Sequence, residues 1–228
     1  VFLRHCKKKP YLMQALITGP ADTPYDSGCF LFDIYAPPEY PKRCPKINLM
    51  TTGGGTVRFN PNLYNCGKVC LSLLGTWGGS SEESWTVDST LLQLLVSIQS
   101  LILVQLPYYN EPGCERSMGS DGAKKLERTS TNGGFERLRV SSLQWGVVDM
   151  LRNPPKGFED VVREHFRIKS EYLTRVMDEW VADATDSDIK ASLEAQIVEV
   201  RKELAKLHFG VAPAAGAGEL EVPAAPTA

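Results

Sequence analysis

The spacing of hydrophobic residues divides the chain into a strand-rich first part and a helix-rich second part. Phe30, Phe32 and Ile34 alternate with other side chains, which is the two-residue period of a half-buried β-strand. Strands are predicted at residues 1–4, 13–18, 29–35 and 46–50. The connections between them are roughly 8 to 12 residues long, which is too short for crossover helices, so we predict an antiparallel meander.

Helical periodicity dominates the second part of the chain. Helices are predicted at residues 87–104, 135–152, 158–184 and 187–207, with a loop at 113–134. The first helix is mainly apolar apart from a narrow polar stripe, so it is predicted to be mostly buried. That stripe consists of Thr90, Gln93, Ser97 and Ser100. The last helix carries a narrow apolar seam that predicts packing on the preceding helix as an antiparallel hairpin or, alternatively, self-association. The seam consists of Ile189, Leu193, Ile197, Val200, Leu204 and Leu207.

These elements together predict an α+β fold, with a four-stranded antiparallel meander sheet packed with helices and a C-terminal helical extension. We expect a core domain at residues 1–152, the helical extension at 153–209 and a tail at 210–228. The tail is rich in Ala, Pro and Gly, which cannot offset the entropy of ordering, so it is expected to be disordered. Because the first residue is not Met, we expect the chain to be a fragment or an excised domain.

Composition narrows the possible classes of function. The 228 residues include 25 Lys and Arg against 27 Asp and Glu, and a net charge of −2 argues against a dedicated nucleic-acid-binding protein. The longest apolar stretch, residues 91–106, is too short and too polar to span a bilayer, and no signal peptide is visible, so we expect no membrane partner. A chain of this length does not need its six cysteines as disulfides, which favours a reducing environment in the cytoplasm or nucleus.

The candidate chemistry lies in residues 59–72. Cys70 follows a turn that contains glycine, and Asn62 lies eight residues earlier, directly after the rigid Pro61. A cysteine in a loop is by itself more often an unreactive thiol than a nucleophile. The nearby amide and the predicted buried helix downstream, which can anchor the segment, shift the interpretation toward a nucleophilic Cys70.

Other cysteine chemistries fit the residues less well. A thiol protease or deubiquitinase needs a histidine base, and the histidines are His5, His165 and His208, of which His165 lies on the apolar face of a predicted helix. Three residues separate Cys66 from Cys70, but no second pair with ligand spacing follows, so we expect no metal. A Cys66–Cys70 disulfide that silences the site needs favourable geometry. No phosphate-binding glycine loop is present, and no cofactor is predicted.

Residues 60–62 and 67–72, with the pattern Asn-Pro-Asn followed by Gly-x-Val-Cys-Leu-Ser, resemble the active-site signature of ubiquitin-conjugating (E2) enzymes. The usual signature has His at the position of Asn60. The resemblance covers about residues 1–151 and implies the ubiquitin-conjugating fold without its first helix. Further matching positions are Gly19, Pro20, Tyr40, Pro41, Trp85 and residues 94–101. Segments 17–25, 58–65 and 107–113 are similar to the giant hybrid E2/E3 subgroup that acts without a separate ligase.

The resemblance implies partners and a role for each candidate residue. Cys70 would accept ubiquitin as a thioester from an activating enzyme and pass it to a lysine of a protein substrate. Asn62 would donate to the oxyanion of this reaction, or would only hold the loop together by bonding the backbone. Glu111 would order the incoming lysine, with Asn110 as the alternative, although a surface carboxylate is often merely solvated.

Several departures from the family pattern limit these expectations. Asn60 replaces a histidine whose role is structural, and residues 75–84 resemble the acidic insertion of some chain-building members or form a plain surface loop. Contact with a RING ligase is doubtful, because Lys42 and Arg43 stand where an apolar anchor is usual and Asp88 departs from the second contact loop. A ubiquitin-binding module without catalysis remains an alternative, although such variants lack the cysteine. A related modifier in place of ubiquitin also remains open.

Overall fold

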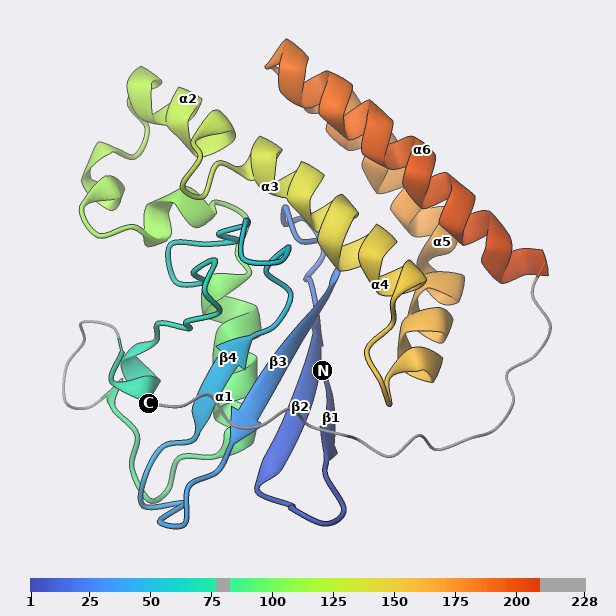
Figure 1. Cartoon of the computed structure of the whole chain (residues 1–228). Helices are drawn as coiled ribbons and strands as arrows, with labels where there is room; N and C mark the ends of the chain where they lie inside the picture. Colours follow the sequence, from blue (N-terminus) through green and yellow to red (C-terminus); the bar gives the residue numbers. More distant parts are fainter. Residues whose placement is uncertain (77–82, 210–228) are drawn as a thin grey trace.

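The computed structural model describes residues 1–76 and 83–209, and it begins with a four-stranded antiparallel sheet. The strands are β1 (Phe2–His5), β2 (Leu12–Thr18), β3 (Cys29–Tyr35) and β4 (Lys46–Leu49), in the spatial order β1-β2-β3-β4. Ile17 lies opposite Phe30, and Ile34 lies opposite Ile47. The predicted antiparallel meander is therefore confirmed (Figure 1).

The two faces of the sheet contribute to two apolar cores. On one face, alternate residues of β2 and β3 such as Ile17 and Phe32 pack with the helix that follows the active-site segment. On the other face, Leu16 and Cys29 join a second core that continues into the C-terminal helices. Because side chains of a strand alternate between faces, neighbouring residues of β2 belong to different cores.

The helix on the first face is α1 (Leu91–Ser97), continued by the wider π-helical turn η3 (Ile98–Ile102). It begins four residues later than predicted, because Thr90 forms a capping box with Gln93 that fixes its start. The prediction that this helix is mostly buried is wrong. Leu94 and its neighbours on one side face the sheet, whereas Leu92 is 68% exposed, because no described element covers the outer side.

The segment predicted as a loop at residues 113–134 contains helices. It follows η4 (Pro107–Asn110) and holds η5 (Cys114–Ser117) and α2 (Asp121–Thr129). Ser120 caps α2 by accepting the N–H of Ala123. Sequence reasoning missed α2 because the helix is short and strongly polar, with Ala123 as its only buried residue.

The helical run predicted at residues 135–152 is divided into α3 (Phe135–Ser141), the π-helical η6 (Ser142–Val148) and α4 (Asp149–Arg152). Gly146 lies in the wider central part. A Cβ at this position would stand 3.3 Å from the Cα of Gly28, so the small residue allows the helix to approach the start of β3 closely.

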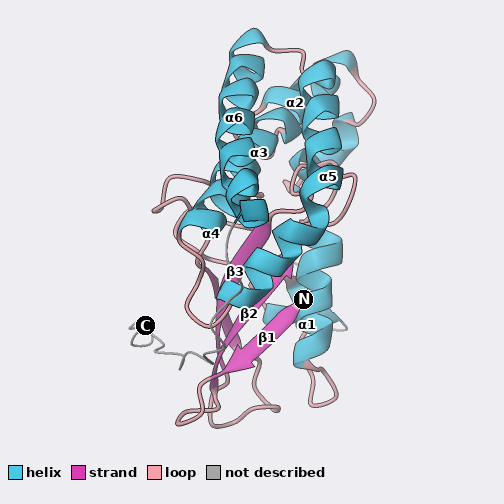
Figure 2. Cartoon of the chain, turned by 90° about the vertical axis from the view of Figure 1, so that its right-hand side faces the viewer, coloured by secondary structure: helices cyan, strands magenta, loops and turns pink. Residues whose placement is uncertain are grey.

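The C-terminal extension consists of α5 (Glu159–Asp183) and α6 (Ser187–Phe209), which pack side by side (Figure 2). They are antiparallel because only residues 184–186 connect them. Residues 189, 193, 197, 200 and 204 of the predicted seam are buried within the chain itself, which confirms the hairpin over the self-association alternative. Trp180 is buried in the same core, and Asp178 pairs with Arg201 at 2.7 Å. Within residues 1–76 and 83–209, no helix is long and apolar enough to cross a membrane.

Candidate active site

The segment that carries Cys70 begins with a tight turn. The N–H of Leu63 donates to the carbonyl oxygen of Asn60 at 2.9 Å, which closes a β-turn with Pro61 at its second position. Proline is favoured there because its ring fixes the required φ. The side-chain Oδ1 of Asn60 also accepts the N–H of Asn62 at 2.8 Å. The proline ring and the Asn60 side chain together set the direction in which Asn62 leaves the turn.

A short hairpin then leads to Cys70. The N–H of Tyr64 donates to the carbonyl of Lys68 at 3.0 Å, and the N–H of Leu49 in β4 donates to the carbonyl of Gly67 at 2.8 Å. Gly67 has a φ of 89°, and a Cβ at this position would lie 2.7 Å from the carbonyl oxygen of Leu49. Glycine therefore permits both the left-handed turn and the close docking of the hairpin on the sheet.

Asn60 is fully buried and holds the turn against its surroundings. Its Nδ2 donates to the carbonyl of Ile102 at 2.8 Å and to the hydroxyl of Tyr25 at 3.3 Å. The Tyr25 hydroxyl donates in turn to the carbonyl of Phe59 at 2.6 Å. Burial raises the pKa of Tyr25, which keeps this hydroxyl protonated as a donor. Asn60 thus performs a scaffold role through an amide network.

Cys70 and Asn62 lie opposite each other. The N–H of Cys70 donates to the carbonyl of Asn62 at 2.9 Å, and the Nδ2 of Asn62 donates to the carbonyl of Cys70 at 2.9 Å. The loop-holding role of Asn62 is therefore present in the structure. An amide nitrogen carries two hydrogens, so one donor remains after this bond. The role of Asn62 as an oxyanion donor stays a prediction that this second N–H can serve.

The residues after Cys70 are fixed by η1 (Ser72–Leu74) and by Thr76. The hydroxyl of Thr76 donates to the carbonyl of Val69 at 3.0 Å and accepts the N–H of Leu71 at 3.1 Å. These two bonds hold the backbone on both sides of Cys70. Most of the insertion predicted at residues 75–84 falls on residues 77–82, which lie outside the described residues.

The thiol of Cys70 is shielded from water, with only 1% of the residue exposed. Burial raises the pKa of Cys70, and the positive charges of Lys68 and Arg58 partly oppose this effect. The thiol is therefore protonated at neutral pH, and its proton has to leave when Sγ forms a bond.

Asn110 and Glu111 lie at the end of η4 and differ in how their side chains are used. The Nδ2 of Asn110 donates to a carbonyl of η3 and to the Oδ1 of Asn60, at 3.1 and 3.3 Å. The Oε2 of Glu111 accepts from the Nδ2 of Asn132 at 2.8 Å and lies 3.7 Å from Nη2 of Arg58. Glu111 is therefore held in place while 37% of its side chain stays exposed, whereas the Asn110 nitrogen is committed to the scaffold.

Arg58 belongs to the site, although sequence reasoning gave it no role. Its Nη2 donates to the carbonyl of Pro61 at 2.8 Å, and its guanidinium carbon stands 4.2 Å from the centre of the Tyr64 ring. The same side chain faces Glu111, so it joins the turn before Cys70 to the end of η4. No local sequence pattern marks Arg58 as a site residue. The one hint in the sequence was that Arg58 lies within segment 58–65, which resembles the hybrid subgroup.

The comparison with known families decides the class of this site. The sequence model of the ubiquitin-conjugating enzyme family matches residues 3–132, which is more than half of the chain. The chain belongs to this family.

Relatives of the chain are named as a dual E2/E3 enzyme and as ubiquitin-conjugating enzymes. The dual E2 ubiquitin-conjugating enzyme/E3 ubiquitin-protein ligase BIRC6 of mouse and of human is 45% identical over 219 residues, which cover 91% of this chain and 4% of BIRC6. The probable ubiquitin-conjugating enzyme E2 R521 of Acanthamoeba polyphaga mimivirus is 44% identical over 82% of this chain and 13% of its own length. The chain thus spans a small part of these relatives, and the predicted likeness to the hybrid E2/E3 type is confirmed.

The two histidines with described side chains, His5 and His165, are engaged with backbone carbonyls away from Cys70. His5 lies 3.3 Å from the carbonyl of Cys6, and His165 lies 2.8 Å from the carbonyl of Ser27. Among the described residues, the charged or titratable groups that shift the pKa of Cys70 are Lys68, Arg58 and Cys66, and no histidine is among them. The side chain of His208 lies outside the described part of the chain.

The two loops that the sequence resemblance matches to a RING-binding surface carry exposed charge. Lys42 and Arg43 are both exposed. Trp85 holds the neighbouring loop in place, because its Nε1 donates to the carbonyl of Pro41 at 2.6 Å. Val87, in the second of these loops, is 59% exposed.

Proposed function

We propose that this domain accepts ubiquitin from an activating enzyme as a thioester on Cys70 and passes it to a lysine of a protein substrate without a separate ligase. The observation that carries the proposal is the pairing of Cys70 with Asn62 in a rigid turn of an E2-family domain. Sulfur is both a good nucleophile and a good leaving group, so one cysteine can serve both steps.

The first step is a thiol exchange. The Sγ of Cys70 attacks the thioester carbonyl that joins ubiquitin to the activating enzyme, and the thiol proton leaves as the new carbon–sulfur bond forms. The thiolate of the activating enzyme departs as the leaving group. Lys68 and Arg58 stabilise the thiolate form of Cys70 and offset part of the rise in pKa that burial causes.

The second step is an attack by an amine. The lysine nitrogen adds to the Cys70 thioester carbonyl, and a negative charge develops on the carbonyl oxygen. One N–H of Asn62 is bound to the Cys70 carbonyl, and we assign the other N–H of the same amide as the donor to this oxygen. The intermediate expels the Cys70 thiolate, which takes up the proton that the amine nitrogen loses, and leaves an isopeptide and the free Cys70 thiol. Glu111, which keeps exposed carboxylate surface beside Arg58, is the residue proposed to order the lysine.

Ligase independence is proposed on two grounds. The relatives with 45% identity are named dual E2/E3 enzymes. In addition, Lys42 and Arg43 present charge on the loop where a RING ligase would bury an apolar anchor, and the burial of unpaired charge is unfavourable. Docking of the substrate is then left to the helical extension or to other parts of a longer protein.

A charging assay tests the first step. The purified domain is mixed with ATP, an activating enzyme and its modifier, for ubiquitin and for related modifiers in parallel. We expect an adduct with ubiquitin that dithiothreitol removes. Cys70→Ser should give at most a resistant oxyester, and Cys66→Ala is the matched control that should charge normally. Normal charging of Cys70→Ala would overturn the proposal.

Single-turnover discharge tests ligase independence. The charged domain is chased with a lysine-bearing protein in the presence and absence of a panel of RING domains. We expect similar rates with and without the panel. Strong stimulation by several RING domains that is lost in Val87→Ala would contradict this part of the proposal, and it would leave the thioester on Cys70 intact.

A further inference from the structure

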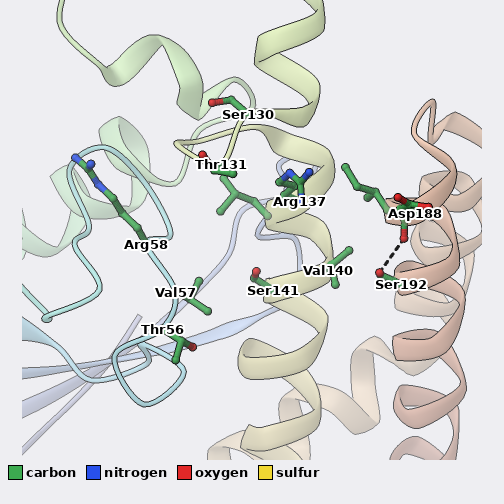
Figure 3. Close-up of a pocket in the computed structure, with 12 residues that line it drawn as sticks. Thr56, Val57, Arg58, Ser130, Thr131, Arg137, Val140, Ser141, Asp188 and Ser192 are labelled. Atoms are coloured by element: carbon green, nitrogen blue, oxygen red, sulfur yellow. Dashed lines mark hydrogen bonds between the residues drawn. The ribbon is translucent and has the colours of Figure 1, made fainter.

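A pocket of about 310 Å³ lies where the E2 core meets the helical extension. Its walls come from the loop at residues 56–58, from the loop before α3 and α3 itself, and from the first turns of α6 (Figure 3). Its apolar lining includes Val57, Leu138 and Ile189. Without α6, this side of α3 would be an open surface, so the extension completes the pocket.

Arg137 is the distinctive charged group of this pocket. Its Nε donates to the carbonyl of Thr129 at 2.7 Å, and within residues 1–76 and 83–209 it forms no ion pair. The arginines nearby are used differently, since Arg128, Arg139 and Arg152 each pair with a carboxylate. A guanidinium with free N–H groups in a fork is the side chain best suited to grip a carboxylate.

The opposite charge in the pocket narrows the class of ligand. Asp188, in the first turn of α6, also lines the pocket and has no ion pair among the described residues. A small free anion would be repelled by this carboxylate. A polypeptide segment brings both an acidic side chain and backbone N–H donors, so it can satisfy Arg137 and Asp188 together. Hydroxyls of Thr131, Ser141 and similar lining residues add further hydrogen-bonding partners.

The pocket is physically joined to the active site. Arg58 lines it, and the same side chain contacts the carbonyl of Pro61 and faces Glu111. We propose that this pocket is a docking site for a segment of the protein substrate that carries an acidic residue, which Arg137 binds. The inference rests on the proposed transfer to protein substrates, and it assigns part of substrate recognition to the junction of the core and the extension.

Peptide binding to the uncharged protein tests the inference without any catalysis. The probe is a fluorescent peptide library with Asp at a fixed central position among uncharged residues, and a matched library has Asn there. Fluorescence anisotropy should show about tenfold tighter binding of the Asp library, the size of one charge-assisted contact. Arg137→Glu should remove this preference and favour a library with Arg at the same position. Arg163→Glu makes the same charge change at an exposed position of α5 and should change nothing.

Two further measurements complete the test. Arg137→Gln keeps a polar side chain and should lose the Asp preference without a change in melting temperature. Lysine-bearing Asp peptides should accept ubiquitin faster than their Asn counterparts, while discharge to free lysine is unchanged in Arg137→Glu. An Asp preference that persists in Arg137→Glu, no preference in wild type, or displacement of the peptides by inorganic phosphate would overturn the inference. Failure of Cys70 to charge would leave the binding result standing, so the two proposals fail separately.

Discussion

The active-site turn and the C-terminal hairpin are held together by different forces. Residues 59–70 are fixed by hydrogen bonds of amide side chains, above all those of Asn60 and Asn62. The α5–α6 hairpin is fixed by an apolar seam, with ion pairs such as Asp178–Arg201 along its surface. Hydrogen bonds are directional and fix atoms in place, whereas apolar packing fixes whole elements and tolerates small shifts.

This difference matches what each region has to do. If Asn62 is the donor that we propose, the reacting carbonyl needs it at a defined position, and an error of an ångström in its placement would slow the proposed transfer strongly. The hairpin only has to hold its helices against the second core and to form one wall of the pocket at Arg137. The comparison predicts that the two regions respond to substitutions in opposite ways.

Truncation of the hairpin core should have the largest effect on stability. Trp180 is 6% exposed, packs in the second core and lies under the guanidinium of Arg139. Trp180→Ala should lower the free energy of unfolding by about 3–5 kcal/mol, because it leaves a large cavity. Ile168→Ala on the exposed side of α5 is the control, and it should change stability by less than about 0.5 kcal/mol. Urea unfolding measures both, and folded Trp180→Ala should still charge at Cys70.

Removal of the buried amide of Asn60 should have a smaller effect on stability and a larger one on activity. Asn60→Ala leaves the partners of this side chain unsatisfied, which should destabilise the domain by on the order of 2 kcal/mol. Asn60→His restores one donor and one acceptor and should recover part of the loss. Asn65→Ala removes only one bond near the surface, to the carbonyl of Gly55, and should be nearly neutral. A neutral Asn60→Ala would break the comparison.

Acid should weaken the hairpin region. Burial raises the pKa of Glu203 and of Asp183, but ion pairs lower both pKa values by more. The partners are Lys206 and Arg152 at Glu203, and Arg139 at Asp183. Both pKa values therefore lie below their ordinary range. The carboxylates therefore stabilise the fold above about pH 4, and this contribution is lost as pH falls through their lowered pKa values. The melting temperature should fall between pH 7 and pH 3, and it should fall less in Glu203→Gln than in wild type. Equal pH slopes in both proteins would contradict the assignment.

The smallest expected effect concerns the reactivity of Cys70. Burial raises its pKa and Lys68 lowers it, so Lys68→Gln should raise the pKa further. The thiolate fraction near pH 8 should fall by about twofold, as expected for one partly screened charge. The rate of alkylation of Cys70 against pH, followed by peptide mass spectrometry, measures this change. Lys125→Gln on the exposed face of α2 should leave the profile unchanged.

The sequence predicted the parts of the fold that repeat a simple period. The alternation of Phe30, Phe32 and Ile34 and the seam that starts at Ile189 each indicated an element whose buried side is confirmed. The pattern failed where burial is one-sided or absent. It placed α1 too deep because the exposed Leu92 looks like a core residue, and it missed α2 because that helix is short, polar and has one buried residue.

The candidate site was only partly within reach of sequence reasoning. The motif pointed to Cys70 and Asn62, and the structure places them opposite each other. The motif carried no information on Arg58, whose partners Pro61 and Glu111 are brought together only by the fold. Contacts between distant segments depend on tertiary packing, so no local pattern could predict them.

The second N–H of Asn62 is the most directly testable part of the account. Asn62→Ala and wild type should be compared in charging at Cys70 and in single-turnover discharge to free lysine. We predict a discharge rate lower by about 10²–10³, as for the loss of one oxyanion donor, with charging within a few-fold of wild type. Equal losses in both steps, in proportion to a loss of melting temperature, would show that Asn62 only holds the loop and would contradict the account.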